Sequence, residues 1–402
     1  YQALTQNTTG VTNTGIGYQA LYANTTGGTN TAVGSSALLD NTTGGHNTAM
    51  GDDALANNTT ADGNTAIGRN SMNANTTGAN NTAVGRNALD ANTTASNNVA
   101  VGHNSLSSNT TGTTTVAVGQ GALEANTTAS SNTAVGFNAM LSNTTGSINT
   151  ALGAYALDAA TTADNNTAVG FGGLGATTTG ANNVAVGSYA LDANTTASNN
   201  TGVGHQSLTD NTTGYGNTAM GKNSLANNTT GYHNTSIGAD SMETNTEGHS
   251  NTAVGESALL ATTDGDNNVA IGMDALKANT TANSNTAVGS AAMIANTTGT
   301  ENVAVGRSAL DANTTASNNT AVGYESMTTN TTGAENVGIG TSALKNNTTG
   351  STNVAVGISA LEDNTTADEN TCVGAYSLTT NTTGASNTAM GTDALRLNTT
   401  GS

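Results

Sequence analysis

The sequence predicts an all-β fold, a β-solenoid or parallel β-roll built from 17-residue coils, and three observations predict it. The stretch Asn30–His46, NTAVGSSALLDNTTGGH, recurs every 17 residues along the whole chain without an insertion or a deletion. One Gly per repeat and clusters of Asn and Thr oppose a helix. A stacked array also escapes the usual limit of about 250 residues around one core. The 402 residues therefore correspond to about 23–24 coils.

Each repeat consists of nearly constant positions and variable positions that are expected at the surface. We number the slots 1 to 17, so that Asn30 is slot 1 and His46 is slot 17. Slot 5 is always Gly, slot 4 is aliphatic or Met, slot 9 is Leu or Met, and slots 3 and 8 are small. Every Asp, Glu, Lys and Arg occupies slot 6, 7, 10, 11, 14, 16 or 17, so these slots are expected to face water. In Asn30–His46, the surface residues that vary freely between repeats are Ser35, Ser36, Gly45 and His46.

Aromatic residues also belong to the variable slots and are not expected in the core. They include, in slots 6, 7 and 16, Tyr18, Phe137, Tyr155, Phe171, Tyr189, Tyr215, Tyr232, Tyr324 and Tyr376.

The residue pattern predicts two short strands and two turns per coil. Slots 1 to 4 alternate with period two, which predicts a half-buried strand with Thr31 and Val33 in the interior. Slots 8 to 14 predict a second extended run, with Leu38 also buried. Gly34 at slot 5 and Gly44 at slot 15, where Gly or Ala occurs, are expected at the turns.

Stacked coils place identical slots about 4.8 Å apart, so each slot forms a column. Asn30 and Asn41, at slots 1 and 12, are expected to form amide ladders from coil to coil. The Thr residues of slots 13 and 14 can add hydroxyl hydrogen bonds. Alternatively, Asn41-Thr42-Thr43 and its copies are N-x-T acceptors for glycans in a secreted protein. The ladder is the preferred interpretation because the fold itself demands Asn at this slot.

The small number of large apolar residues favours a shared core. Slots 4 and 9 supply only two such side chains per coil, whereas ordering 17 residues costs about 17–34 kcal/mol. We therefore expect a parallel homotrimer that also buries slots 3 and 8, with a monomeric solenoid as the alternative. Residues 1–402 are expected to form one uninterrupted solenoid without capping repeats. The chain starts at slot 6 and stops at slot 16, so we expect it to be part of a longer fibre.

Charge and cysteine content narrow the classes of partner. The 26 acidic and 7 basic residues give a net charge of −19, which argues against nucleic acid as a partner. No leader-like segment and no apolar run of about 18 residues is found, so neither a signal peptide nor a membrane span is expected in this sequence. The single Cys372 replaces the Ala of slot 3, which indicates a small packing residue instead of a reactive thiol.

Four copies of the motif NVAVG, each followed by Ala-Leu or Ser-Leu at slots 8 and 9, suggest a family. They are Asn98–Gly102, Asn183–Gly187, Asn302–Gly306 and Asn353–Gly357. The motif resembles the head repeats of YadA-like trimeric autotransporter adhesins, which form a left-handed parallel β-roll, and similar repeats in phage tail fibres. The resemblance implies a trimeric extracellular fibre that binds itself and host surfaces, matrix or glycans. The 17-residue period is longer than that family's usual coil, and the NTT segment is an additional insert.

No residue pattern indicates a catalytic or metal site. The histidines are His46, His103, His205, His233 and His249. His103 and His205 share slot 6 but lie six coils apart, while His233 and His249 have no third ligand in register. The acidic pairs Asp52-Asp53 and Asp368-Glu369 are interpreted as solubilising turn residues. We therefore expect no catalytic residue, no cofactor and no bound metal.

Three functions from different classes remain after these exclusions. The first is a structural or adhesive fibre at a cell or virion surface, with variable turns that make the contacts. The second is an ice-binding β-solenoid, in which regular Thr columns at slots 13 and 14 contact water. The third is a carbohydrate-processing enzyme on a β-helix, which needs a carboxylate pair that interrupts the repeat. No such interruption is seen, and the fibre is the preferred function.

Overall fold

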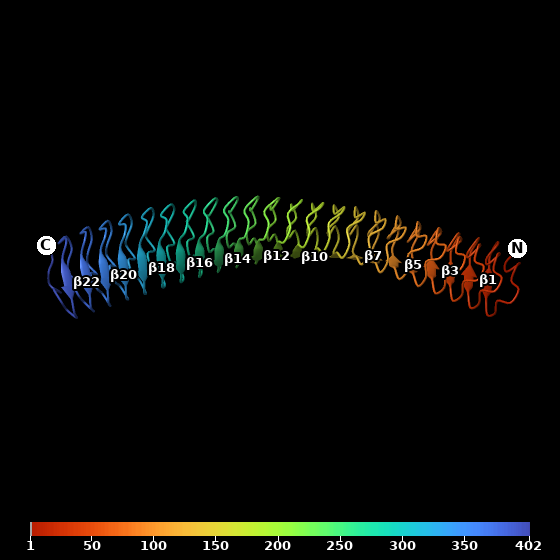
Figure 1. Ribbon diagram of the computed structural model, residues 1–402, viewed down its shortest axis with the longest axis horizontal. Helices are drawn as coiled ribbons and strands as arrows, with labels where there is room; N and C mark the ends of the chain where they lie inside the picture. Colours follow the sequence, from red (N-terminus) through yellow and green to blue (C-terminus); the bar gives the residue numbers. More distant parts are fainter. Residues whose placement is uncertain (1) are drawn as a thin grey trace. The chain divides into compact units, whose positions relative to one another are not determined.

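The computed structural model describes residues 2–402, which fold as a parallel β-solenoid with one three-residue strand per coil. Residues 2–402 contain 23 strands and no helix. The chain divides into two compact units, Tyr1–Asn199 and Asn200–Ser402. Figure 1 shows the strands of each unit as arrows along one side of its stacked coils. The all-β solenoid of 17-residue coils is thus confirmed, while one uninterrupted solenoid over residues 1–402 stays a prediction.

The first unit contains eleven strands, and within the unit consecutive strands pair in parallel. They are β1 (Thr14–Ile16), β2 (Thr31–Val33), β3 (Thr48–Met50), β4 (Thr65–Ile67), β5 (Thr82–Val84), β6 (Val99–Val101), β7 (Val116–Val118), β8 (Thr133–Val135), β9 (Thr150–Leu152), β10 (Thr167–Val169) and β11 (Val184–Val186). Each strand residue pairs with the residue at the same slot of the neighbouring repeat, as Thr31 pairs with Thr48.

The second unit contains twelve strands with the same pairing. They are β12 (Thr201–Val203), β13 (Thr218–Met220), β14 (Thr235–Ile237), β15 (Thr252–Val254), β16 (Val269–Ile271), β17 (Thr286–Val288), β18 (Val303–Val305), β19 (Thr320–Val322), β20 (Val337–Ile339), β21 (Val354–Val356), β22 (Thr371–Val373) and β23 (Thr388–Met390). Identical slots are again directly opposite, as in the pairing of Thr218 with Thr235.

The strand faces are opposite to the sequence prediction. Ala32, at slot 3, is fully buried, whereas Thr31 and Val33 are only half-buried. Assigning Thr31 and Val33 to the interior was therefore wrong. Leu38, at slot 9, is fully buried as expected. The interior of a coil contains one large apolar side chain at slot 9, the small residues of slots 3, 8 and 15, and the Asn side chains of slots 1 and 12.

The narrow interior explains why the larger side chains of the strand point outward. Where slot 3 is Gly15, an added Cβ would lie 3.2 Å from Leu4 Cγ and 3.3 Å from the Ala20 carbonyl oxygen. At Gly338, another slot 3, a Cβ would lie 2.8 Å from Ser326 Oγ. Slot 3 therefore packs directly against slots 8 and 9 and leaves room for little more than a methyl group.

The second extended run predicted for slots 8 to 14 is absent. Leu38 has a φ of 53° and Ser36, at slot 7, has a φ of 54°, so the chain turns repeatedly across slots 5 to 11. A left-handed backbone is unfavourable for Leu, by about 1–2 kcal/mol. It is maintained because the side chain is buried and the Leu38 N–H donates to the Ala54 carbonyl at 3.0 Å.

The two glycine turns have different physical origins. Gly34 has a φ of 140°, and a Cβ there would lie 2.3 Å from the Gly51 carbonyl oxygen of the next coil. Slot 5 thus requires Gly, as predicted. Gly44 has no positive φ, and Ala61 occupies the same slot in the next coil. Slot 15 needs a small residue because it is buried, not because its backbone is left-handed.

The predicted Asn ladders are present, and both end on the same carbonyl group. Asn41 Nδ2 donates to Asn24 Oδ1 of the preceding coil at 2.8 Å and to the Gly44 carbonyl at 2.9 Å. Asn30 Nδ2 donates to the same Gly44 carbonyl at 2.9 Å, and Asn30 Oδ1 accepts from the Asn47 N–H of the next coil at 2.9 Å. Slots 1 and 12 therefore close each coil and also join it to its neighbours.

The Thr columns behave differently from each other. Thr42 Oγ1, at slot 13, donates to the Thr59 carbonyl of the next coil at 3.0 Å, so this predicted ladder is confirmed. Thr43, at slot 14, is exposed to solvent. Slot 13 therefore contributes to cohesion between coils, and slot 14 belongs to the surface.

Candidate functional surfaces

The charged and aromatic side chains all lie on the surface columns, as predicted. Among residues 2–402, no Asp, Glu, Lys, Arg, His, Phe or Tyr is buried. The candidate functional groups therefore lie on the irregular runs outside the strands, at slots 6, 7, 10, 11, 14, 16 and 17.

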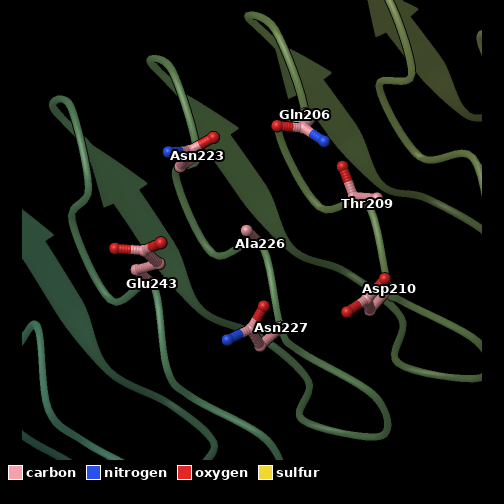
Figure 2. Close-up of a pocket in the computed structure, with 7 residues that line it drawn as sticks. All are labelled: Gln206, Thr209, Asp210, Asn223, Ala226, Asn227 and Glu243. Atoms are coloured by element: carbon pink, nitrogen blue, oxygen red, sulfur yellow. The ribbon is translucent and has the colours of Figure 1, made fainter.

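A small hollow lies on three coils of the second unit. Figure 2 shows that its lining residues come from the irregular runs and not from the strands. They are Gln206, Thr209, Asp210, Asn223, Ala226, Asn227 and Glu243. The volume is about 210 Å³, below the roughly 300–1,000 Å³ of typical small-molecule sites. The polar lining and the small volume do not resemble such a site.

The hollow lies where slot 7 of one coil faces slot 10 of the next, and the same two slots contact each other elsewhere in both units. Lys345 Nζ, at slot 10, lies 2.8 Å from Glu325 Oε2 of slot 7. Asn104 Nδ2 of slot 7 donates to Glu124 Oε1 of slot 10 at 3.3 Å. The two columns therefore face each other along the stack. We call this feature the slot 7/10 groove.

Burial and hydrogen bonding perturb several acids of this groove. The pKa values of Asp90, Asp158 and Asp311, all at slot 10, are raised chiefly because burial penalises the charged carboxylate. The hydrogen bond with Lys345 lowers the pKa of Glu325. The slot 10 column is thus partly withdrawn from water, whereas the rim of the groove is open.

The histidines form no common centre. His249 Nε2 lies 3.3 Å from Asp266 Oδ2, and its ring stacks on Tyr232 with centroids 4.6 Å apart. His233 contacts the same Tyr232 ring edge-on at 5.3 Å, while His103 contacts Arg86 elsewhere. Within the described chain, no group of three or more His, Cys, Asp and Glu side chains could hold a metal ion.

The two acidic pairs lie on turns. Asp52 is exposed and lies 3.7 Å from Arg69 Nε of the next coil. Asp368 and Glu369 are exposed, and Asp368 Oδ1 accepts a hydrogen bond from the Ser351 N–H at 2.7 Å. These carboxylates join neighbouring turns, and they are not brought together across a cleft.

Aromatic rings of successive coils meet each other, which the sequence analysis did not anticipate. In the first unit, Phe137, Tyr155, Phe171 and Tyr189 form a row of edge-to-face contacts. In the second unit, Tyr215 and Tyr232 are stacked with centroids 5.1 Å apart. The signal was present in the sequence, because aromatic residues at slots 6, 7 or 16 of adjacent coils must lie about 5 Å apart.

The burial of Cys372 and of Asn41 bears on two predictions from the sequence. Cys372 is buried at slot 3, as expected, and burial raises the pKa of its thiol to about 12. Asn41 is fully buried and its amide nitrogen donates twice. A glycan on Asn41 would therefore require loss of the ladder, so the glycosylation alternative does not fit the folded coil.

Comparisons with known proteins give no family assignment. No protein-family model matches the sequence, and no curated protein matches it significantly. No helix in residues 2–402 is long and apolar enough to cross a membrane.

Proposed function

We propose that the protein is a structural extracellular fibre or adhesin without catalytic activity. Its coils form a rigid scaffold that presents variable turn residues at a cell or virion surface. One observation carries this proposal: the buried slots are nearly constant, whereas all charged and aromatic residues between positions 2 and 402 lie on surface columns. The NVAVG motifs, with their resemblance to adhesin heads and tail fibres, support the extracellular location.

The outer strand face supports self-association. Its slot 4 column is apolar in every strand, and Met50 and Ile271 are about 40% exposed. Its slot 2 column is Thr or Val, so the face carries no charge despite the net charge of −19. Two copies can therefore meet on this face without like-charge repulsion. We place the contact of the proposed homotrimer or filament here, because Ala32 and Ala37 are already buried within one chain.

Attachment can be tested with purified protein on beads. We expect coated beads to be retained on cell surfaces or matrix proteins. We also expect retention to fall when the charged and aromatic residues of slots 6, 7, 16 and 17 are replaced by the Ser and Asn found at the same slots elsewhere. An unchanged circular dichroism spectrum would show that the scaffold is intact. Undiminished retention of the replaced protein would contradict the proposal.

Self-association needs its own measurement, the mass of the native particle by light scattering. A mass of three chains or an open filament supports the proposed assembly. Replacing Met50 and Ile271 with Thr should then weaken it, because these residues lie on the outer strand face. A monomer at all concentrations would contradict the assembly but not the display of turn residues.

Ice binding is a second candidate, supported by the regular exposed Thr columns. Thr43 and its slot 14 equivalents are exposed, and the half-exposed slot 2 column is Thr in most strands. Such columns repeat about every 4.8 Å and can order water regularly. Thermal hysteresis in a freezing assay would support this function, and its absence would remove it.

A further inference from the structure

The row of aromatic rings in the first unit is the most specialised part of the surface. Four consecutive coils each contribute one ring, from Phe137, Tyr155, Phe171 and Tyr189 in turn. Neighbouring centroids lie 5.3, 5.7 and 5.3 Å apart, with interplanar angles of 75°, 73° and 70°. Each residue is between 37% and 44% exposed. We call this row the aromatic ladder.

The backbone holds the aromatic ladder in place. The rings alternate between slots 6 and 7, and the Tyr155 N–H donates to the Phe137 carbonyl at 3.0 Å. The Tyr189 N–H likewise donates to the Phe171 carbonyl at 2.9 Å. Edge-to-face contacts between the half-exposed rings orient each ring relative to its neighbours. The ladder is therefore preorganised, and a ligand would lose little entropy in ordering it.

Two carboxylates lie beside the ladder, next to a coil that lacks side chains at slots 7 and 10. These residues are Gly172 and Gly175. A Cβ on Gly172 would lie 3.3 Å from Tyr189 Cδ1 and 3.8 Å from Asp192 Oδ1. A Cβ on Gly175 would lie 2.7 Å from Asp192 Oδ1 and 3.7 Å from Asp158 Oδ1. The Tyr189 ring and the Asp192 carboxylate thus lie where larger residues at these slots would place their side chains, and Asp158 lies close to them.

We propose that the aromatic ladder and the adjacent carboxylates bind a linear, uncharged polysaccharide. The electron-rich face of an aromatic ring attracts the weakly positive C–H groups of a sugar ring. Asp158 and Asp192 lie beside Gly175 and can accept hydrogen bonds from sugar hydroxyl groups. The rings repeat along the stack, so an extended polymer can contact several of them at once. This inference rests on the proposed attachment function and names its ligand.

The charges around the ladder exclude the other polymers that stack on aromatic residues. Single-stranded nucleic acids also bind rows of aromatic rings, but they need a basic groove. Residues 104–199 contain no Lys, Arg or His, while Glu124, Asp158 and Asp192 line the slot 10 column. Nucleic acids and sulfated glycans would therefore be repelled. A neutral sugar polymer satisfies both the ring faces and the carboxylates.

The experiment is isothermal titration calorimetry of the full chain with cellohexaose and with chitohexaose, which are neutral β-linked hexasaccharides. Heparin and single-stranded DNA serve as anionic probes. We expect at least one hexasaccharide to bind and neither anion to bind. A variant that lacks all four rings should bind with an affinity lowered by about tenfold or more. Its substitutions are Phe137→Ser, Tyr155→Asn, Phe171→Ser and Tyr189→Asn. These replacements occur at the same slots of other coils, so the fold should be retained.

Two further variants make the test specific. Tyr376→Asn removes a slot 7 ring that contacts Arg396 and lies outside the ladder, so hexasaccharide affinity should be unchanged. Gly172→Asn adds a side chain that recurs at slot 7, against Tyr189 and Asp192, and leaves all four rings, so affinity should fall severalfold. Wild-type affinity in the four-residue variant would overturn the inference, as would preferential binding of heparin or DNA.

The two proposals fail in different ways. Retention of coated beads on cell surfaces without binding of either hexasaccharide would overturn the ladder inference and leave the attachment function intact. Hexasaccharide binding that depends on the ladder, together with no retention on any surface, would support the inference and contradict the attachment function.

Discussion

The buried Asn columns and the exposed turn columns belong to the same coils but tolerate change very differently. Slots 1 and 12 are nearly always Asn, because each amide bonds within its own coil and to a neighbouring coil. Slots 6, 7, 16 and 17 hold almost any residue, from Gly to Tyr. The difference teaches that identity is fixed where a side chain completes a buried hydrogen-bond network, and is free where it meets water.

One coil shows the cost of breaking this rule. Ala160 replaces Asn at slot 12, and the preceding Asn143 Oδ1 is buried without a hydrogen-bond partner. Thr262 has a similar effect, because Asn245 Oδ1 of the preceding coil also lacks a partner. The chain therefore tolerates occasional gaps in the ladder, but the gaps at Ala160 and Thr262 each leave a buried acceptor unsatisfied.

The largest expected effect comes from the turn that every coil shares. Gly170→Val should destabilise the first unit by roughly 3 kcal/mol or more, because φ is 132° and a Cβ would lie 2.5 Å from the Gly187 carbonyl oxygen. Thermal unfolding followed by circular dichroism would measure this. Gly173→Ala is the matched control, since that Cβ would meet only atoms at 3.7 Å or beyond. Equal stability of the two variants would refute the slot 5 turn.

A pair of substitutions in one coil compares the two columns directly. Asn92→Ser should cost about 2 kcal/mol, because it removes the 2.8 Å bond to Asn75 Oδ1 and leaves that acceptor buried. Asn97→Ser should change stability by no more than about 0.5 kcal/mol, because Asn97 is exposed and Ser131 occupies the same slot in another coil. Hydrogen exchange of residues 75–110 would report both. Similar protection of the backbone amides from exchange in the two variants would show that the Asn ladder does not contribute to stability.

The buried thiol predicts how the core responds to alkaline pH. Burial raises the pKa of Cys372 from 9.0 to about 12, so the unfolded thiol ionises first. Between these values the unfolded state binds fewer protons, and stability should fall by up to about 1.4 kcal/mol per pH unit relative to Cys372→Ala. Below pH 9 this difference should not vary with pH. Parallel pH profiles for the two proteins up to pH 12 would contradict burial of the thiol.

A gain of stability should follow from repairing the ladder. Ala160→Asn provides a donor for Asn143 Oδ1 and should stabilise the surrounding coils by about 1 kcal/mol. Ala159→Asn, one residue away at slot 11, is the control and should have little effect, because Asn57 and Asn227 occupy that slot elsewhere. Hydrogen exchange would again measure the change. No gain from Ala160→Asn would mean that the orphaned acceptor is not costly.

Much of the fold follows from the sequence because the period alone specifies the stacking. The 17-residue repeat predicts the parallel register, and slot 5 requires Gly in every coil. The Asn ladders could also be predicted, because a column of identical amides has few other ways to be satisfied when buried. The surface location of Tyr155 and of every charged residue followed from their restriction to the variable slots.

The strand orientation could not be predicted from the alternation of residue types. Thr31 and Val33 are larger and more β-prone than Ala32, so period-two reasoning placed them inside. Slots 3, 8 and 9 pack closely within a coil, so the small slot 3 residue points inward and slots 2 and 4 point outward. This packing is a tertiary property that the local sequence does not encode. Likewise, no local preference predicts a positive φ at Leu38, since packing and a hydrogen bond between coils impose it.

The candidate sites were only partly visible in the sequence. The slots of Phe137 and Tyr155 were known to be exposed, but not that their rings touch. Gly172 and Gly175 look like ordinary variation in the repeat. Only the fold shows that Asp158 and Asp192 come close to Gly175 and lie beside the rings.

The central claim is that the scaffold is independent of the residues it displays, and one measurement tests it most directly. The thermal unfolding midpoint of the variant with Phe137→Ser, Tyr155→Asn, Phe171→Ser and Tyr189→Asn should lie close to that of the wild type, because its buried columns are unchanged. A strongly lowered midpoint would mean that the displayed rings hold the coils together, and would contradict the separation of scaffold from surface.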